Sequence, residues 1–165
     1  MNLLQRSSQT LRAAELIKQG FKTNIVVQDT GLSSNIIRTL YKEVQGESPK
    51  AGQLPSPASI LSTTQALLHA SMLMAHYTKR VEEELENRVD INWLIQAYNY
   101  YRNEVKQQND VEKNRLLSVN ESWVLARGLV AKLIQVHLCQ SGHFYISTPK
   151  QRTLPVCPFC KLQQH

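Results

Sequence analysis

The sequence is poor in the residues that mark several classes of protein. It has six glycines, six prolines and three cysteines among 165 residues, and 7% of the residues are aromatic. This composition argues against a collagen-like, low-complexity or disulfide-scaffold chain. No hydrophobic run approaches the roughly 20 residues of a membrane span, and residues 1–20 lack the apolar stretch of a signal peptide. We therefore expect a cytoplasmic protein with its own hydrophobic core and no membrane contact.

The net charge of +6 is unevenly distributed along the chain. Residues 1–50 carry seven Lys or Arg against four Asp or Glu, residues 51–110 carry five against seven, and residues 111–165 carry seven against two. Both ends are therefore basic. Because phosphate neutralisation dominates non-specific DNA affinity, two basic ends are consistent with two DNA-facing surfaces. A modest positive charge is also common in proteins that bind no DNA, so it supports this interpretation only together with motifs.

A helix-turn-helix pattern occupies residues 23–44. Thr23–Thr30 reads as a short helix, and Gly31 tolerates the positive φ of a turn. Ser33 or Ser34 can cap a second helix that runs to Val44. A helix over Leu11–Gly20 would precede the pair and complete a three-helix unit. We expect it to pack on the pair through Leu11, Ala14, Leu16 and Ile17.

The second helix of this pattern has two distinct faces. Its apolar face predicts a buried stripe of Leu32, Ile36, Ile37, Leu40, Tyr41 and Val44. The opposite face carries Ser34, Asn35, Arg38 and Lys42. Asn suits adenine, Arg suits guanine, and Ser or Lys suits phosphate, so this face resembles a recognition surface for the DNA major groove. The alternative is an ordinary helical hairpin whose polar face is solvated.

Residues 45–57 are rich in Gly, Pro and Ser and predict a boundary, either a linker or a loop that brings Lys50 to the DNA backbone. Helical periodicity returns over residues 59–86, 90–106 and 111–138. His69 and His76 are interpreted as core-edge or surface residues rather than ligands, and the tyrosines of 90–106 as core or interface residues rather than stacking platforms for bases. The fold class is therefore mainly α. We expect a helix-turn-helix unit over 1–50, a helical core and partner interface over 51–135, and a small zinc-ribbon-like cap over 136–165.

The cysteines predict a structural zinc site in that cap. Cys157 and Cys160 form a C-x-x-C pair that can chelate one Zn²⁺, and Cys139 is the natural third ligand. The fourth can be His143, His137 or His165, and His143 is preferred because Gly142 allows a turn with ligands at both ends. Phe144–Ser147 is expected to form a strand that pairs with residues around Leu154 and Val156. No acidic residue nearby could serve as a catalytic base, which argues against a zinc hydrolase.

A longer run of residues resembles a known family. Leu40-Tyr41-Lys42-Glu43, Ser48-Pro49-Lys50, Leu54-Pro55 and His69-Ala70-Ser71-Met72 occur in the order seen in FlhC, the C subunit of the bacterial flagellar master transcription activator. The resemblance covers most of the chain. It implies an α-helical, zinc-containing protein that binds promoter DNA in a hetero-oligomer with an FlhD-like helical subunit and contacts RNA polymerase.

Two departures from the family pattern concern the C-terminal region. The family has two C-x-x-C pairs, whereas only Cys139 stands in the region of the first pair, and only five residues follow Cys160 where flagellar members have a basic tail. These departures favour a divergent member of the kind found on conjugative mobile elements. The resemblance therefore leaves open whether flagellar or conjugative-transfer promoters are controlled.

The sequence thus predicts a non-enzymatic DNA-binding transcriptional activator subunit. The expected DNA contacts are Ser34, Asn35, Arg38, Lys42, Lys50, Lys150, Arg152 and Lys161, and the expected ligands of a structural Zn²⁺ are Cys139, His143, Cys157 and Cys160. The alternative is a zinc-stabilised adaptor that binds proteins without specific DNA binding. The operator sequence and the stoichiometry of the complex do not follow from the sequence.

Overall fold

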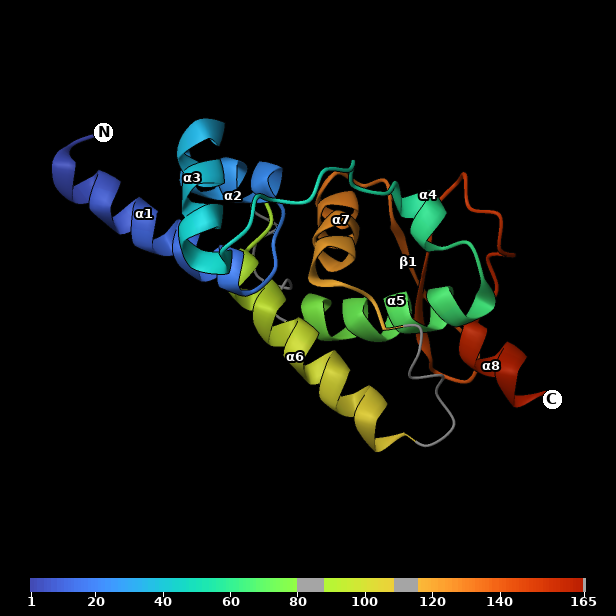
Figure 1. The fold of residues 1–165 in the computed structure, drawn as a ribbon. Helices are drawn as coiled ribbons and strands as arrows, with labels where there is room; N and C mark the ends of the chain where they lie inside the picture. Colours follow the sequence, from blue (N-terminus) through green and yellow to red (C-terminus); the bar gives the residue numbers. More distant parts are fainter. Residues whose placement is uncertain (80–87, 109–115, 165) are drawn as a thin grey trace. The chain divides into compact units, whose positions relative to one another are not determined.

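The computed structural model describes residues 1–79, 88–108 and 116–164 (Figure 1). It forms two compact units, Met1–Gln53, called unit 1, and Leu54–His165, called unit 2. The division falls inside the Gly-, Pro- and Ser-rich segment 45–57. The expected cap, residues 136–165, lies within unit 2. In the described part of the chain, no helix is long and apolar enough to cross a membrane.

Unit 1 consists of three helices: α1 (Leu3–Lys18), α2 (Thr23–Thr30) and α3 (Ser34–Gln45). The first helix begins earlier than the expected Leu11 because Asn2 and Gln5 form a capping box. The Asn2 side chain accepts from the Gln5 backbone N–H at 2.8 Å, and the Gln5 side chain accepts from the Asn2 N–H at 3.1 Å. This reciprocal pair satisfies two N–H groups that a helix start otherwise leaves open.

The turn between α2 and α3 confirms the helix-turn-helix. Gly31 adopts a φ of +70°, which a residue without Cβ reaches at no steric cost. The Thr30 hydroxyl donates to the Val26 carbonyl at 2.7 Å and accepts from the Leu32 N–H at 3.3 Å. Ser33 is the N-cap of α3 and accepts from the Ile36 N–H. Side-chain oxygens thus close the end of one helix and open the next.

The core of unit 1 is apolar. All three helices contact one another, and the buried side chains are Ala13, Leu16, Ile17, Phe21, Ile25, Val26, Leu32 and Ile37. The expected packing of Leu11 is wrong, because this side chain is 70% exposed. Helix α1 has 16 residues and α2 has eight, so the shorter helix covers only the C-terminal part of α1. Within the expected stripe of α3, Leu32 and Ile37 are buried, and the other four members are partly exposed.

Unit 2 is built around α5 (Thr64–Thr78), which contacts α6 (Ile91–Gln107), α7 (Val119–Val130), α8 (Pro158–Gln163) and a β-hairpin. Figure 1 shows α5 in the middle of these elements. Nine of its residues are buried, among them Leu67, Leu73 and Met74. A helix that is apolar on nearly all sides is typical of a domain centre. A short helix, α4 (Pro57–Ile60), precedes it and contacts α7.

The helix expected over 59–86 is divided. Ser56 caps α4, and Thr63 caps α5 by accepting from the Ala66 N–H at 3.1 Å. Residues 80–87, which include the acidic run, lie outside the described residues. The helix expected over 90–106 is present as α6, with Asp90 as its N-cap.

The helix expected over 111–138 is wrong at its C-terminal end, while residues 111–115 lie outside the described part. Helix α7 ends at Val130, and Lys132 adopts a φ of +57°. The Gly128 carbonyl accepts from the N–H groups of Leu133 and Ile134, at 2.8 and 3.1 Å. These bonds close the helix end, and the chain continues as a strand.

That strand, β1 (Gln135–Leu138), pairs antiparallel with β2 (Phe144–Ser147), with Val136 opposite Ile146. The expected pairing of Phe144–Ser147 with residues around Leu154 and Val156 is therefore wrong. A short connection closes the hairpin, since the Cys139 N–H donates to the His143 carbonyl at 3.0 Å. The Ile146 N–H donates to the Ser71 hydroxyl at 3.2 Å and ties β2 to α5.

Candidate metal centre and candidate DNA-facing residues

Four potential metal ligands meet between the β-hairpin and α8. Cys139 follows β1 and His143 precedes β2, so both ends of the hairpin turn contribute a ligand. Cys157 is the N-cap of α8, and Cys160 lies in its first turn. The three sulfurs and one histidine nitrogen all lie within 4.8 Å of one another, and the group could hold a metal ion.

The spacing of these atoms fits a tetrahedral ion. With metal–sulfur bonds of about 2.3 Å and metal–nitrogen bonds of about 2.0–2.1 Å, a tetrahedron has S–S edges of about 3.8 Å and S–N edges of about 3.5 Å. The Sγ atoms of Cys139 and Cys160 are 3.8 Å apart. His143 Nδ1 lies 3.5, 3.7 and 3.4 Å from the sulfurs of Cys139, Cys157 and Cys160. The donor set and these four edges therefore fit a closed four-ligand site, and the two remaining sulfur–sulfur distances are at most 4.8 Å.

Local interactions orient these ligands. Gly142 adopts a φ of +80°, and its N–H donates to the Cys139 carbonyl at 2.9 Å, which folds the turn. The His143 ring stacks on Phe159, with centroids 5.2 Å apart. Burial acts to raise the pKa of the Cys139 thiol, but donation from the His143 N–H and hydrogen bonds with the neighbouring cysteines outweigh it and lower that pKa to about 6. Cys139 is thus favoured as a thiolate, the form that binds metals.

Of the other two histidines considered as ligands, His137 is not part of this group. His137 Nε2 lies 2.7 Å from the Ser147 hydroxyl, and its ring stacks on Tyr145. Strand β1 therefore directs His137 across the hairpin. His165 lies outside the described residues.

The four polar residues expected to read DNA are all exposed on α3. Ser34, Asn35, Arg38 and Lys42 are exposed along the helix, whereas Ile37 is buried. Two long-range hydrogen bonds attach α3 to the preceding part of unit 1. The Tyr41 hydroxyl donates to the Phe21 carbonyl, and the Gln45 amide donates to the Ile17 carbonyl at 3.1 Å. The polar face is thus presented on a rigid helix.

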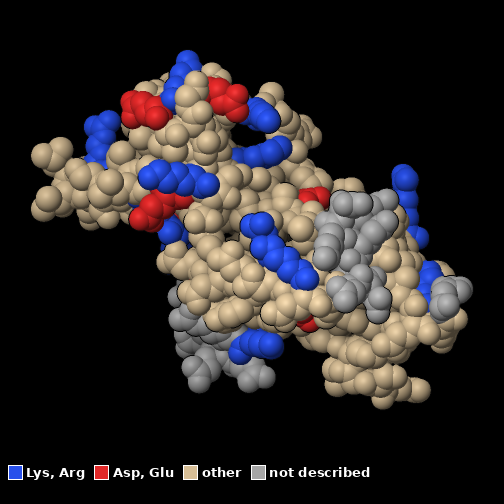
Figure 2. Space-filling view, turned by 60° about the horizontal axis from the view of Figure 1, so that its bottom comes forward, with Lys and Arg blue, Asp and Glu red and all other residues tan. Residues whose placement is uncertain are grey.

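The remaining expected DNA contacts fall in different surroundings. Lys50 is exposed in the segment that follows α3. Lys150 and Arg152 line a pocket in unit 2. Lys161 donates to the Thr64 hydroxyl at 3.1 Å and so links α8 to the start of α5. On the face drawn in Figure 2, Lys and Arg side chains stand in separate groups rather than in one continuous patch.

Sequence reasoning missed the hydroxyl groups beside Lys150 and Arg152. Ser56, Ser59 and Ser62 line the same pocket. They recur every third residue in the sequence, a spacing that places side chains on one side of a helical turn. The regular spacing of the serines is the only sequence signal for this pocket. It does not indicate that Lys150 and Arg152, which lie far away in the sequence, complete the lining.

A three-helix unit that exposes the polar face of its third helix is the arrangement of helix-turn-helix transcription regulators. Residues 1–165 match the family described as Flagellar transcriptional activator (FlhC) over their whole length, so the chain belongs to this FlhC family. The family comprises transcriptional regulators and not enzymes.

Individual relatives carry the same description. The chain is 31% identical to the flagellar transcriptional regulator FlhC of Gallionella capsiferriformans over 161 residues, which cover 96% of this chain and 86% of that protein. It is 30% identical to the regulator of the same name from Verminephrobacter eiseniae, with 96% and 84% covered. The FlhC of Proteus mirabilis is 27% identical, with 94% and 80% covered.

Proposed function

We propose that this chain is the DNA-binding subunit of a transcriptional activator that works in a hetero-oligomer with an FlhD-like helical protein and recruits or contacts RNA polymerase at promoters. Flagellar promoters are the favoured targets, because the family description and the named relatives refer to flagellar regulation. Conjugative-transfer promoters are the alternative targets.

The exposed polar face of α3 carries this proposal. Asn35 and Arg38 have the side chains that form bidentate bonds with adenine and guanine, respectively. Ser34, Lys42 and Lys50 suit backbone phosphates, which position a protein on DNA without reading sequence. Lys161 keeps two of its three ammonium protons for a phosphate, because one is donated to Thr64.

We assign the metal group to a structural Zn²⁺ held by Cys139, His143, Cys157 and Cys160. Cys and His are preferred zinc ligands, and a site that fills all four positions from the protein has no place for a reactive water. The ion would join the hairpin turn to the start of α8, two segments separated by residues 144–156. It would thereby stiffen the C-terminal part of unit 2.

The FlhD-like partner requires an apolar surface, and α1 offers one. Leu3, Leu4 and Leu11 are 80%, 81% and 70% exposed. The apolar residues of α5 are instead largely buried inside unit 2. We therefore place a partner contact on the N-terminal half of α1. An exposed apolar helix face is the kind of surface that a second helix covers.

The decisive experiment captures the tagged chain from its native cells with DNA cross-linked, and identifies the bound DNA and the co-purified protein. Enriched promoter fragments and a small helical partner support the proposal. The promoters distinguish flagellar from transfer genes.

The recovered promoter then serves in a binding titration. Arg38→Ala should weaken specific binding by about 1–3 kcal/mol and relax the preference for one base pair. Lys18→Ala, which removes an exposed cation elsewhere in unit 1, is the control and should preserve sequence preference. An Arg38→Ala protein that keeps full affinity and preference contradicts the assignment of α3.

A protein-interaction adaptor is the second candidate. The exposed apolar side chains near the hairpin, Leu133, Val136 and Leu138, favour it. An adaptor predicts a co-purified protein without enriched DNA, and no steep salt dependence of residual DNA binding. Phosphate contacts predict the opposite, because each one releases counterions.

A further inference from the structure

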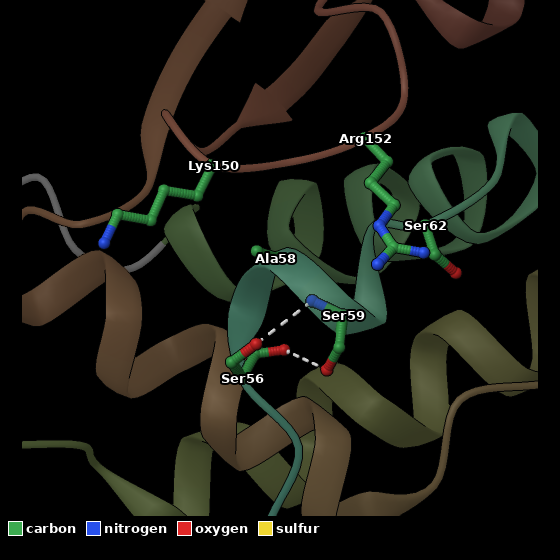
Figure 3. Close-up of a pocket in the computed structure, with 6 residues that line it drawn as sticks. All are labelled: Ser56, Ala58, Ser59, Ser62, Lys150 and Arg152. Atoms are coloured by element: carbon green, nitrogen blue, oxygen red, sulfur yellow. Dashed lines mark hydrogen bonds between the residues drawn. The ribbon is translucent and has the colours of Figure 1, made fainter.

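Unit 2 contains a pocket with a volume of about 380 Å³. It is lined by Ser56, Ala58, Ser59, Ser62, Lys150 and Arg152 (Figure 3). The serines come from α4 and the residues next to it, and the two cations come from the segment after β2. Two elements far apart in the sequence therefore contribute hydroxyl and cationic groups to one site.

The backbone segment that carries Lys150 and Arg152 is held in place by hydrogen bonds of Gln151, which lies between them. Gln151 accepts from the Thr148 N–H at 2.8 Å and donates to the Thr153 carbonyl at 2.9 Å. The Thr153 hydroxyl donates to the Leu61 carbonyl at 2.8 Å. These bonds close the segment on itself and attach it to the residues that follow α4. Lys150 and Arg152 are thus carried by an anchored backbone.

The serine side is also ordered. The Ser56 hydroxyl oxygen accepts from the Ser59 N–H at 3.2 Å, and the Ser59 hydroxyl donates to the Ser56 carbonyl at 2.8 Å (Figure 3). Because Ser56 accepts through its oxygen, its proton is still available to donate. No described residue accepts the hydroxyl protons of Ser56 and Ser62. The pocket therefore offers at least two neutral donors beside two cations.

The chemistry of the lining selects an anion. None of the six lining residues is acidic, and neither Lys150 nor Arg152 forms an ion pair with a described residue. The lining has no aromatic side chain on which a nucleobase could stack, the usual means of holding an unpaired base. A phosphate group with its sugar suits these donors better than a complete nucleotide does.

We propose that this pocket binds two neighbouring backbone phosphates of the promoter DNA, one at Lys150 and one at Arg152, with the Ser56 and Ser62 hydroxyls as further donors. The inference rests on the proposed DNA binding and adds to Lys161 a second contact region in unit 2, which is independent of base reading by α3. A free inorganic phosphate offers the same chemistry. The experiment must therefore separate the two sources.

The test uses the full chain with its co-purified partner, titrated against the recovered promoter fragment and a scrambled fragment at several salt concentrations. At 0.15 M salt, each lost phosphate contact should weaken binding about fivefold and reduce the slope of log K against log salt by about 0.9. Lys150→Gln with Arg152→Gln should therefore weaken binding to both fragments about 30-fold. The preference for the promoter should stay unchanged.

Three variants sharpen the interpretation. Ser62→Ala should weaken binding to both fragments equally. It should leave the slope of log K against log salt unchanged, because a neutral donor releases no counterion. Arg152→Lys keeps the positive charge and should therefore retain most of the salt slope of the unaltered protein, which the double variant loses. Lys106→Gln removes an exposed cation at the end of α6 and should leave the slope as in the unaltered protein.

The outcomes are distinct. An unchanged slope in the double variant overturns the inference while DNA binding itself stands. Inorganic phosphate that shifts the Arg152 side-chain resonance in NMR, together with an unchanged DNA slope, identifies a free-anion site and also overturns it. No DNA binding by the unaltered complex removes the proposed function and this inference together.

Discussion

The two units differ in how many polar side chains they bury. Unit 1 buries one, Thr30, whereas the described part of unit 2 buries His69, Ser71, Ser122, Ser147 and Thr148. Thr30 is satisfied within its own helix. In unit 2 Ser122 likewise donates to the Ser118 carbonyl at the start of its own helix, but other partners come from different elements, as in the bond between Ser71 on α5 and Ile146 on β2. Apolar packing tolerates small shifts of its side chains. A buried polar group that loses its hydrogen-bond partner instead lowers the free energy of unfolding, because its desolvation is no longer offset.

The metal group extends this contrast. Three cysteines and one histidine of unit 2 lie together between the hairpin turn and α8 and could hold a metal ion, whereas unit 1 contains no cysteine. The C-terminal part of unit 2 has little apolar material between β2 and α8, and Leu154 and Val156 are exposed. We infer that ligand bonds replace a hydrophobic core there, while unit 1 needs only packing and helix caps.

The largest expected effect is the loss of a metal ligand. His143→Ala should release the ion and unfold the segment around α8, because structural zinc sites supply on the order of 10 kcal/mol of binding free energy. Metal content by mass spectrometry and the thermal transition provide the measurement. His137→Ala is the matched control, since this ring bonds Ser147 outside the group. Equal metal content in both variants would contradict the proposed site.

The second effect concerns packing in unit 1. Leu16→Ala removes a fully buried side chain and should lower the free energy of unfolding by about 2–5 kcal/mol. Leu11→Ala changes the same residue type on the same helix at an exposed position and should cost little. Denaturant titration checks both. The comparison between units fails if Leu16→Ala also releases the metal, because the two units would then not be stabilised separately.

The parts of the fold that the sequence predicts correctly are those with local causes. Gly31 and Ser33 act on their immediate neighbours, so α2 and α3 follow from the sequence. The earlier start of α1 is also locally encoded, in the Asn2 and Gln5 capping box, but hydrophobic periodicity alone does not reveal it. Strand β1 is wrongly predicted as helix because its formation depends on pairing with β2, a partner that no local periodicity reveals.

The candidate sites divide in the same way. Cys157 and Cys160 are close in sequence, so their spacing alone identifies a metal-type pair. The meeting of Ser56 and Ser62 with Lys150 and Arg152 depends on how α4 and the segment after β2 pack, which the sequence does not state directly. Spacing within a motif is thus predictable, and the need of an ion for four ligands also links Cys139 and His143 to this pair, whereas contacts without such a shared chemistry require the folded chain.

The smallest expected effect tests whether the buried polar pairs of unit 2 matter. The Tyr101 hydroxyl lies 2.7 Å from His69 Nδ1 and accepts from the Leu117 N–H at 3.1 Å. Tyr101→Phe removes the partner of both groups and should cost about 1–3 kcal/mol. Tyr100→Phe is the control because Tyr100 is 54% exposed. Equal stability of the two variants would contradict a stabilising role for the hydrogen bonds of the buried Tyr101 hydroxyl.

The same variant carries a pH signature. Burial raises the pKa of Tyr101 to about 12 from the ordinary value of 10.0. Its neutral form is thus favoured in the folded state, and the unfolded chain ionises first as the pH rises. The stabilisation is complete below pH 10 and decreases between pH 10 and 12. The unaltered protein should lose more stability than Tyr101→Phe across that range in urea titrations, and parallel losses would contradict a buried, hydrogen-bonded Tyr101.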